Sequence, residues 1–188
     1  MIIIQSHQST WRNEFLALGS NLRQVLGELA LRIDHIGSTS VPGLAAKDII
    51  DIQITVPTLE PTIVSLLAKI GYHQIQQITQ DHLPPGASQT SGWVKWLFKP
   101  SSSHRPVNVH VRVAGQPNQR YALLFRDYLR THPTSVQAYA HVKLALAKYH
   151  ADNVEAYYDV KDPVCDLIMG GAEIWAVATL WQPSPTDC

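Results

Sequence analysis

The sequence lacks three features, each of which would have pointed to a particular class of protein. It has two cysteines among 188 residues, too few for a disulfide framework. Its 15 Lys plus Arg balance 15 Asp plus Glu, so it has no electrostatic footprint for duplex nucleic acid. No apolar run reaches the roughly 18 residues that a membrane-spanning helix needs. We therefore expect a reduced, cytoplasmic protein whose partners are neither duplex nucleic acid nor a membrane.

Common nucleotide and metal motifs are also missing. The chain contains neither a Walker loop nor a Gly-x-Gly-x-x-Gly run. Its nine histidines are scattered, with no His-x-x-x-His or paired-cysteine spacing of the kind that binds zinc. At 188 residues the chain is expected to form one domain, residues 1–188, with a core large enough to be stable alone.

Hydrophobic periodicity predicts helices and strands in the first two thirds of the chain and helices alone after them. Apolar residues at steps of three and four from Trp11 to Leu29 form one helical stripe. The expected helices cover 10–30, 60–71, 118–131, 133–150 and a last segment, and the expected strands cover 31–36, 49–56, 72–80, 93–99 and 107–113. This order favours an α+β fold with a helical C-terminal part.

The same patterns predict details of the connections and of the last helix. Residues 44–47 are expected to form a helical turn, and residues 182–188 a frayed tail. Pro163 is expected in the first turn of the last helix, where its missing N–H is tolerated. The buried stripe of that helix is expected to consist of Val164, Leu167, Ile168, Gly171, Ile174, Trp175 and Ala178.

Charged and aromatic residues of the later helices have mostly surface interpretations. Arg126, Asp127 and Arg130 are typical of a solvated helix face. Tyr139 and Lys143 are four residues apart and therefore neighbours on one face. They are interpreted as a surface pair, with closure over a pocket as the alternative.

The most informative stretch follows the first expected strand. Gly37 lets the backbone approach a ligand closely. The three hydroxyl residues after it are Ser38, Thr39 and Ser40. Such a turn can bind a phosphate through its hydroxyls and N–H groups. Asp51 lies in an apolar strand, where an acid is costly unless it is used. It is our candidate catalytic residue and metal ligand, for Mg²⁺ on that phosphate; the alternative is an acid bonded to a loop.

Two neighbours of this stretch have two interpretations each. Lys47 either neutralises a phosphate or is a surface lysine. His35 either packs within its strand or lines the pocket. The strand that carries Asp51 is expected beside the strand that ends near His35, because the turn can serve Asp51 only across neighbouring strands.

A later strand presents three polar side chains on one face. Asn108, His110 and Arg112 alternate along residues 107–113, so they point the same way. Three such side chains on a central strand would be costly without a ligand or water. We interpret His110 as a second catalytic candidate, Arg112 as a phosphate ligand and Asn108 as pocket lining. The alternative is an edge strand with a wet face. The site interpretation expects all three to line one cavity with Ser38 and Asp51.

Several stretches of the sequence together resemble the GrpB-like proteins, a small bacterial family. They are residues 35–44 (HIGSTSVPGL), Lys47, residues 50–52 (IDI), residues 108–112 (NVHVR), residues 124–133 (LFRDYLRTHP) and residues 138–143. The resemblance covers about residues 10–178. It implies the fold of the nucleotidyltransferase superfamily, a mixed sheet flanked by helices.

The resemblance allows the metal-binding acids of that superfamily to be compared with the residues at the matching positions of this sequence. In that superfamily a Gly-Ser turn is followed by two acids on one strand and a third on a later strand, which together bind two Mg²⁺ ions. Asp51 matches the first acid, but Gln53 stands at the second position, and the third falls near Asn108 or His110. If His110 and His35 replaced acids, they would favour a softer metal than Mg²⁺.

Two functions are expected from these observations. The first is an enzyme that transfers a nucleotidyl group from a nucleoside triphosphate to a small acceptor, with residues 37–39 on the phosphates and Asp51 on the metal. Lys47 or Arg112 would offset the developing charge. The second is a module that binds a nucleotide or a CoA ester after losing the metal-binding acids. The resemblance adds a link to CoA metabolism, because a similar domain is joined to dephospho-CoA kinase in some bacteria.

Overall fold

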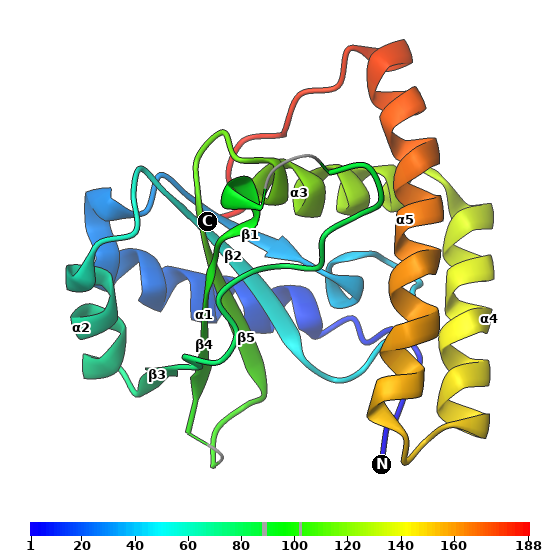
Figure 1. The fold of residues 1–188 in the computed structure, drawn as a ribbon. Helices are drawn as coiled ribbons and strands as arrows, with labels where there is room; N and C mark the ends of the chain where they lie inside the picture. The colour runs from blue at the N-terminus through cyan, green and yellow to red at the C-terminus, as the bar shows by residue number, and fades with distance from the viewer. Residues whose placement is uncertain (88–89, 102) are drawn as a thin grey trace.

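A five-stranded mixed sheet lies at the centre of the computed structural model, which describes residues 1–87, 90–101 and 103–188 (Figure 1). The strands are β1 (Arg32–Ile36), β2 (Ile50–Val56), β3 (Tyr72–Gln74), β4 (Trp96–Pro100) and β5 (Val107–Val113). They lie in the order β1-β2-β5-β4-β3. β2 and β5 run parallel, and the other neighbouring pairs are antiparallel. The predicted pairing of the Asp51 strand with the preceding strand is confirmed, since Ile36 lies opposite Asp51.

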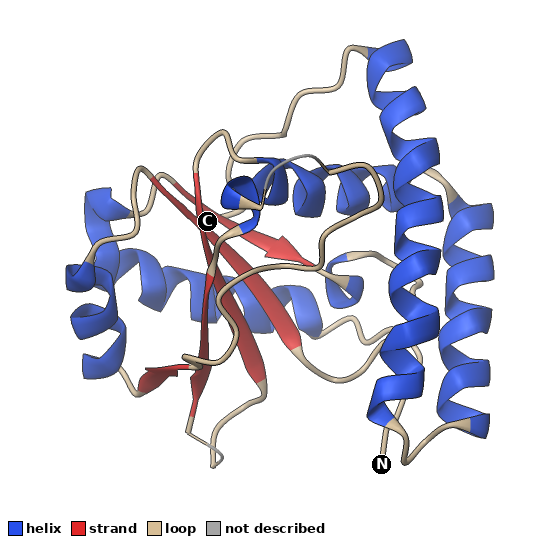
Figure 2. Cartoon of the chain, in the orientation of Figure 1, coloured by secondary structure: helices blue, strands red, loops and turns tan. Residues whose placement is uncertain are grey.

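Helices flank the sheet and form the C-terminal part (Figure 2). They are α1 (Trp11–Leu26), α2 (Pro61–Lys69), α3 (Pro117–Thr131), α4 (Pro133–Tyr149) and α5 (Val154–Thr179). α4 and α5 lie side by side at the right of Figure 1 and contact each other. The predicted α+β class with a helical C-terminal part is confirmed. Within the described ranges, no helix is long and apolar enough to cross a membrane.

The two faces of the central strands have opposite character. Ile52, Ile54 and Val109 pack with residues of α1 and α2 in the main hydrophobic core. Because side chains alternate along a strand, Asp51 and Gln53 point to the other face. Gln53 there donates a hydrogen bond to the Gln119 carbonyl of α3. The polar residues of β2 and β5 therefore face α3 and the C-terminal helices.

The prediction of a frayed C-terminal tail is wrong, because the last residues of the chain run along the free edge of β1. Ile33 N donates to Thr186 Oγ1 at 2.9 Å, and Cys188 N donates to the Ile33 carbonyl at 3.1 Å. His35 N donates to the Asp187 carboxylate at 3.0 Å. An edge strand leaves backbone groups unpaired, and this tail satisfies some of them.

The surface interpretations of the later helices are also wrong in part. Arg126 is fully buried and donates to Asp127 and to Asp187, each at 2.7 Å. Tyr139 and Lys143 are buried as well, so they are not a surface pair. These helix faces are covered by the tail and by the turn after β1, which lie far away in the sequence.

α5 begins earlier than predicted. Asn153 caps its first turn, where the Asn153 side chain accepts a hydrogen bond from Ala156 N at 3.0 Å. Pro163 therefore lies inside α5 and not in its first turn. The predicted stripe is wrong in part, because Leu167 and Ile174 are 79% and 75% exposed. Its members Val164, Ile168 and Trp175 do pack against buried residues. The side of α5 that packs with α3 carries Met169, Ala172 and Ala176.

Two short connections differ from their predictions. Residues 44–47 are not helical, because Ala46 pairs with Gln5 in an isolated antiparallel bridge. The strand predicted at 72–80 ends at Gln74, and Gln80 forms a separate bridge with Val94. Pairing with distant segments decides both conformations.

Candidate functional site

The turn after β1 brings a glycine directly against Asp51. Gly37 has a φ of +69°, and Ser38–Ser40 follows as a 3-10 turn. A Cβ atom on Gly37 would lie 2.5 Å from Asp51 Oδ2. Both the backbone conformation and the close approach therefore require glycine here. The result is that Ser38 and the Asp51 carboxylate stand at the wall of the same cavity.

Replacing Gly37 by alanine is expected to lower the free energy of unfolding by about 1–3 kcal/mol. The reason is twofold: an L-residue is strained at this φ, and the new Cβ would collide with Asp51. Urea unfolding followed by circular dichroism measures the loss. Gly43→Ala is the matched control, because Gly43 has a φ of +80° but open space around a Cβ. Equal losses in both variants would show that the collision with Asp51 has no cost.

Asp51 is held by two side chains of the neighbouring strand β5. Asn108 Nδ2 donates to Asp51 Oδ1 at 2.8 Å, and His110 Nε2 lies 3.6 Å from the same oxygen. Burial alone would raise the pKa of Asp51, but His110 and Asn108 outweigh it, and the pKa is lowered. Asp51 is therefore ionised at neutral pH.

The two predicted histidines lie on opposite faces of the sheet. His35 stacks on Phe15 of α1, with 4.7 Å between ring centroids, and its Nε2 lies 3.0 Å from Thr39 Oγ1. His110 faces the other side with Asp51. Burial lowers the pKa of both histidines to about 4, so each ring is neutral at pH 7. A neutral His110 can donate from one ring nitrogen and accept at the other.

Asp81 adds a second carboxylate beside the cavity. Arg112 Nε and Nη2 each donate to the Asp81 carboxylate at 2.8 Å, and Lys95 Nζ donates to it at 2.6 Å. Burial would raise the pKa of Asp81, but Arg112 and Lys95 hold it well below its usual range. Arg112 Nη1 also donates to Gln53 Oε1 at 2.6 Å. The Gln53 amide thus fixes the guanidinium of Arg112.

Lys143 reaches the same region from α4. Its side chain is 2% exposed, and Nζ donates to Ser38 Oγ at 2.9 Å and to the Ala45 carbonyl. Nζ also lies 4.5 Å from the centroid of the Tyr139 ring. Burial lowers the pKa of Lys143 to about 7. A bound anion next to Ser38 would restore the ammonium charge.

Five lysines line one cavity of about 580 Å³, which we call the lysine cavity. They are Lys47, Lys95, Lys99, Lys143 and Lys161. Three aspartates line it with them, namely Asp51, Asp81 and Asp162. Among the described residues, two of the lysines form salt bridges with these aspartates, at 2.6 and 2.8 Å, and the other three form none. The cavity therefore has excess positive charge and suits a ligand with several negative charges.

A smaller cavity of about 270 Å³, the inner cavity, adjoins the lysine cavity. Ser38, Asp51 and His110 line both. The predicted site residues found along one or both cavities are Gly37, Ser38, Thr39, Lys47, Asp51, Asn108, His110 and Arg112. The expectation of one shared cavity is wrong in part, because Asn108 lines the lysine cavity and Arg112 the inner cavity, while His110 and Asp51 line both. Gln53 is fully buried beneath them. His35 and Ser40 line a separate pocket beside α1. The roles predicted for these residues stay predictions.

Six charged residues that line the lysine cavity were not predicted from the sequence as site residues. They are Asp81, Lys95, Lys99, Lys143, Lys161 and Asp162. Asp81 and Lys95 flank a loop rich in proline and glycine, where no local pattern marks a functional side chain. Lys143 had one signal, its helical spacing from Tyr139, and the pocket alternative for that pair is the one that the structure supports.

The donor set does not fit a centre with two Mg²⁺ ions. Within the described part of the chain, no three His, Cys, Asp or Glu side chains are grouped so as to hold a metal. The Gln53 side-chain oxygen already accepts a hydrogen bond from Arg112, and the Asp81 carboxylate already accepts hydrogen bonds from Arg112 and Lys95. The nearby guanidinium and ammonium groups would also repel a cation. Asp51 is the predicted metal ligand. Among the described residues, its carboxylate forms no salt bridge with a Lys or Arg side chain.

Known proteins resemble the chain in sequence and in structure. The dephospho-CoA kinase of Mycolicibacterium paratuberculosis is 36% identical over 188 residues, which cover 92% of this chain and 46% of that protein. The chain thus spans about half the length of such relatives. The crystal structure of the conserved protein GrpB from Enterococcus faecalis superposes with a TM-score of 0.74 and 31% identity, covering 92% of this chain and 99% of that one.

A more remote likeness is to Cid1 in complex with its short product ApU. That structure gives a TM-score of 0.46 and 14% identity, over 78% of this chain and 46% of that one, which is too low to carry an argument about activity. The model of the family described as GrpB protein matches residues 1–170. The chain therefore belongs to the GrpB family.

Proposed function

We propose that this protein binds a nucleotide or another small phosphate-bearing molecule in the lysine cavity. The observation that carries the proposal is that five lysines line one cavity together with Ser38 and Thr39 of the turn after β1. Ser38 Oγ is already oriented by Lys143 Nζ. Hydroxyl groups, a tight glycine turn and ammonium groups are the elements that recognise phosphate oxygens.

The relatives narrow the choice of phosphate-bearing molecules to be tried. Several are named dephospho-CoA kinase, and this chain resembles a region that makes up 46% of them. CoA, dephospho-CoA and adenine nucleotides are therefore the first ligands to test. A ligand of this kind fits the cytoplasmic location expected from the sequence.

Nucleotidyl transfer is a second candidate function, favoured by the position of Asp51 beside Gly37. Transfer in this superfamily would require Mg²⁺, for which Asp51 is the predicted ligand. The two functions make opposite predictions for one substitution. Without a metal, Asp51→Asn removes a negative charge from the cavity and should strengthen anion binding about two- to fivefold. With a metal held by Asp51, the same change should weaken nucleotide binding.

The test is calorimetric titration of the wild type and Asp51→Asn with ATP, inorganic triphosphate and adenosine, with and without Mg²⁺. Our proposal predicts that ATP and triphosphate bind without Mg²⁺, that adenosine binds at least tenfold more weakly, and that Asp51→Asn binds ATP more tightly. Binding that requires Mg²⁺ and is lost in Asp51→Asn would support transfer instead. If neither ATP, triphosphate nor CoA bound at millimolar concentration, both functions would be refuted.

A further inference from the structure

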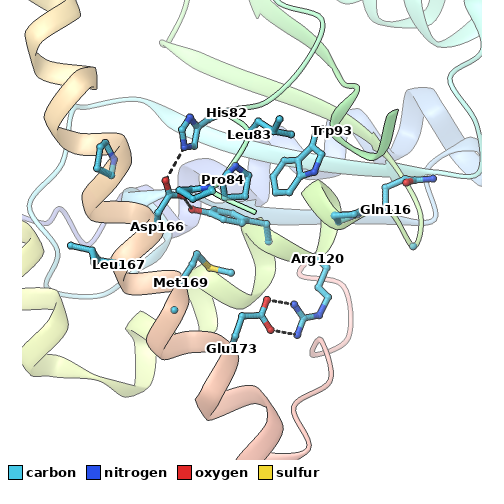
Figure 3. A pocket seen from close by; sticks show the side chains of 16 residues that line it. His82, Leu83, Pro84, Trp93, Gln116, Arg120, Asp166, Leu167, Met169 and Glu173 are labelled. Carbon is cyan, nitrogen blue, oxygen red and sulfur yellow. Dashed lines mark hydrogen bonds and ion pairs between the residues drawn. The ribbon is translucent and has the colours of Figure 1, made fainter. Parts of the chain in front are cut away.

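A large apolar groove lies beside the polar cavities, between the segment after β3 and helices α3 and α5. It has a volume of about 1100 Å³. Leu83, Pro84 and Trp93 form one side, and Leu167 and Met169 of α5 form the other (Figure 3). A groove of this size and composition is typical of sites that bind the hydrophobic part of a small molecule.

The charged groups at this groove already have partners. The Arg120 guanidinium donates two hydrogen bonds to the Glu173 carboxylate, at 2.5 and 2.9 Å. His82 Nε2 lies 2.9 Å from Asp166 Oδ2 (Figure 3). With these groups paired, the surface left for a ligand is mainly hydrocarbon and aromatic rings. The groove therefore favours an apolar occupant.

The groove adjoins the site already described. His82, Trp93 and Tyr121 line both the groove and the inner cavity, and the inner cavity shares Ser38 and Asp51 with the lysine cavity. The positively charged lysine cavity, the inner cavity and the apolar groove therefore adjoin one another in that order. One molecule could occupy all three.

We propose that the ligand is amphipathic: a phosphate-bearing head in the lysine cavity and an acyl chain, or a similar apolar arm, in the groove. This inference rests on the proposed function, because the head group is the phosphate-bearing molecule proposed there. The groove then acts as the part of the site that selects among such molecules by their apolar arm. Each methylene group that it buries should strengthen binding by roughly two- to fourfold.

The test compares CoA, hexanoyl-CoA and decanoyl-CoA by calorimetric titration below their micelle-forming concentrations. Affinity should rise from CoA to hexanoyl-CoA to decanoyl-CoA, by at least tenfold overall. Gly170→Phe fills the groove without disturbing the core, because a Cβ on Gly170 meets no atom within 4 Å. This variant should lose the gain from the acyl chain and keep the affinity for CoA.

Val177→Phe is the matched control, since Val177 is an exposed residue of α5 that does not line the groove. It should bind all three compounds as the wild type does. If CoA binds but the acyl chains add nothing, or if Gly170→Phe keeps their full effect, the inference is refuted and the proposed function stands. Binding of decanoyl-CoA that inorganic triphosphate cannot weaken would place the ligand outside the lysine cavity and refute the inference too. If no CoA compound, ATP or triphosphate binds, the proposed function fails with it.

Discussion

At pH 6.5, Lys143→Met is expected to weaken the binding of ATP by at least 30-fold and to leave the folded protein about as stable as the wild type. Lys143 Nζ donates to Ser38 Oγ at the cavity wall, so it is placed to contact a phosphate bound by Ser38. Removing one partner of a buried, hydrogen-bonded charge pair costs about 2 kcal/mol or more. The free protein loses little, because burial already disfavours the Lys143 ammonium and methionine has a similar volume.

The pH dependence gives this prediction a second, independent measurement. The pKa of Lys143 is lowered from 10.5 to about 7 in the folded protein. Between these values the unfolded chain binds more protons at Lys143 than the folded protein does. The stability of the wild type should therefore rise with pH from 7 to 10.5, relative to Lys143→Met. ATP affinity should fall over the same window, because Lys143 loses its proton. Near pH 8, binding should take up a proton, which titrations in buffers of different ionisation enthalpy detect.

Lys148→Met is the matched control for Lys143→Met. Lys148 is an exposed residue of the same helix, and it does not line the lysine cavity. Its loss should change ATP affinity less than twofold. An ATP affinity that stays constant between pH 6 and pH 9 in the wild type, or that is equal in the two variants, would show that Lys143 does not contact the phosphates.

The sequence was sufficient for those parts of the fold that depend on local pattern. The alternation of 107–113 and the stripe that begins at Trp11 correctly indicated a strand and a helix. The failures lie where distant segments meet. The tail residue Asp187 binds Arg126, and no periodicity could reveal that contact. On α5, Leu167 and Ile174 matched a buried spacing but face outward, because α3 packs against another side of the helix.

The candidate site was predicted unevenly for a similar reason. Asp51 and His110 could be found because a polar side chain in an apolar strand is costly and therefore conspicuous. Asp81 could not be found in this way, because an acid in a predicted loop is expected to be solvated. It is buried only in the folded protein, where Arg112 and Lys95 donate hydrogen bonds to it. His35 shares the sequence signal of His110 but lies on the opposite face of the sheet, which the order and register of the strands decide.

Arg112→Met is expected to lower the free energy of unfolding by about 3–5 kcal/mol at pH 7. The variant would leave the Asp81 carboxylate with Lys95 and Asn118 as its hydrogen-bonding partners, and Gln53 Oε1 without its donor. The pKa of Asp81 is held low in the folded wild type, so its stabilising effect is complete above the unfolded pKa of 3.8 and declines as pH falls below it. The difference between variant and wild type should therefore be largest near neutral pH and smaller at pH 3. Urea unfolding at both pH values measures it.

Arg120→Met provides the matched control, because Arg120 also forms a two-point ion pair, with Glu173, but at the surface. An exposed pair of this kind contributes about 0.2–1 kcal/mol. A second variant, Arg112→Met with Asp81→Asn, should recover part of the lost stability, since the unpaired buried charge is removed. If Arg112→Met lowered the free energy of unfolding no more than Arg120→Met does, then hydrogen bonds from Lys95 and Asn118 would be enough to stabilise the buried Asp81 carboxylate. In that case Arg112 would be free to bind a ligand phosphate, as the sequence predicted.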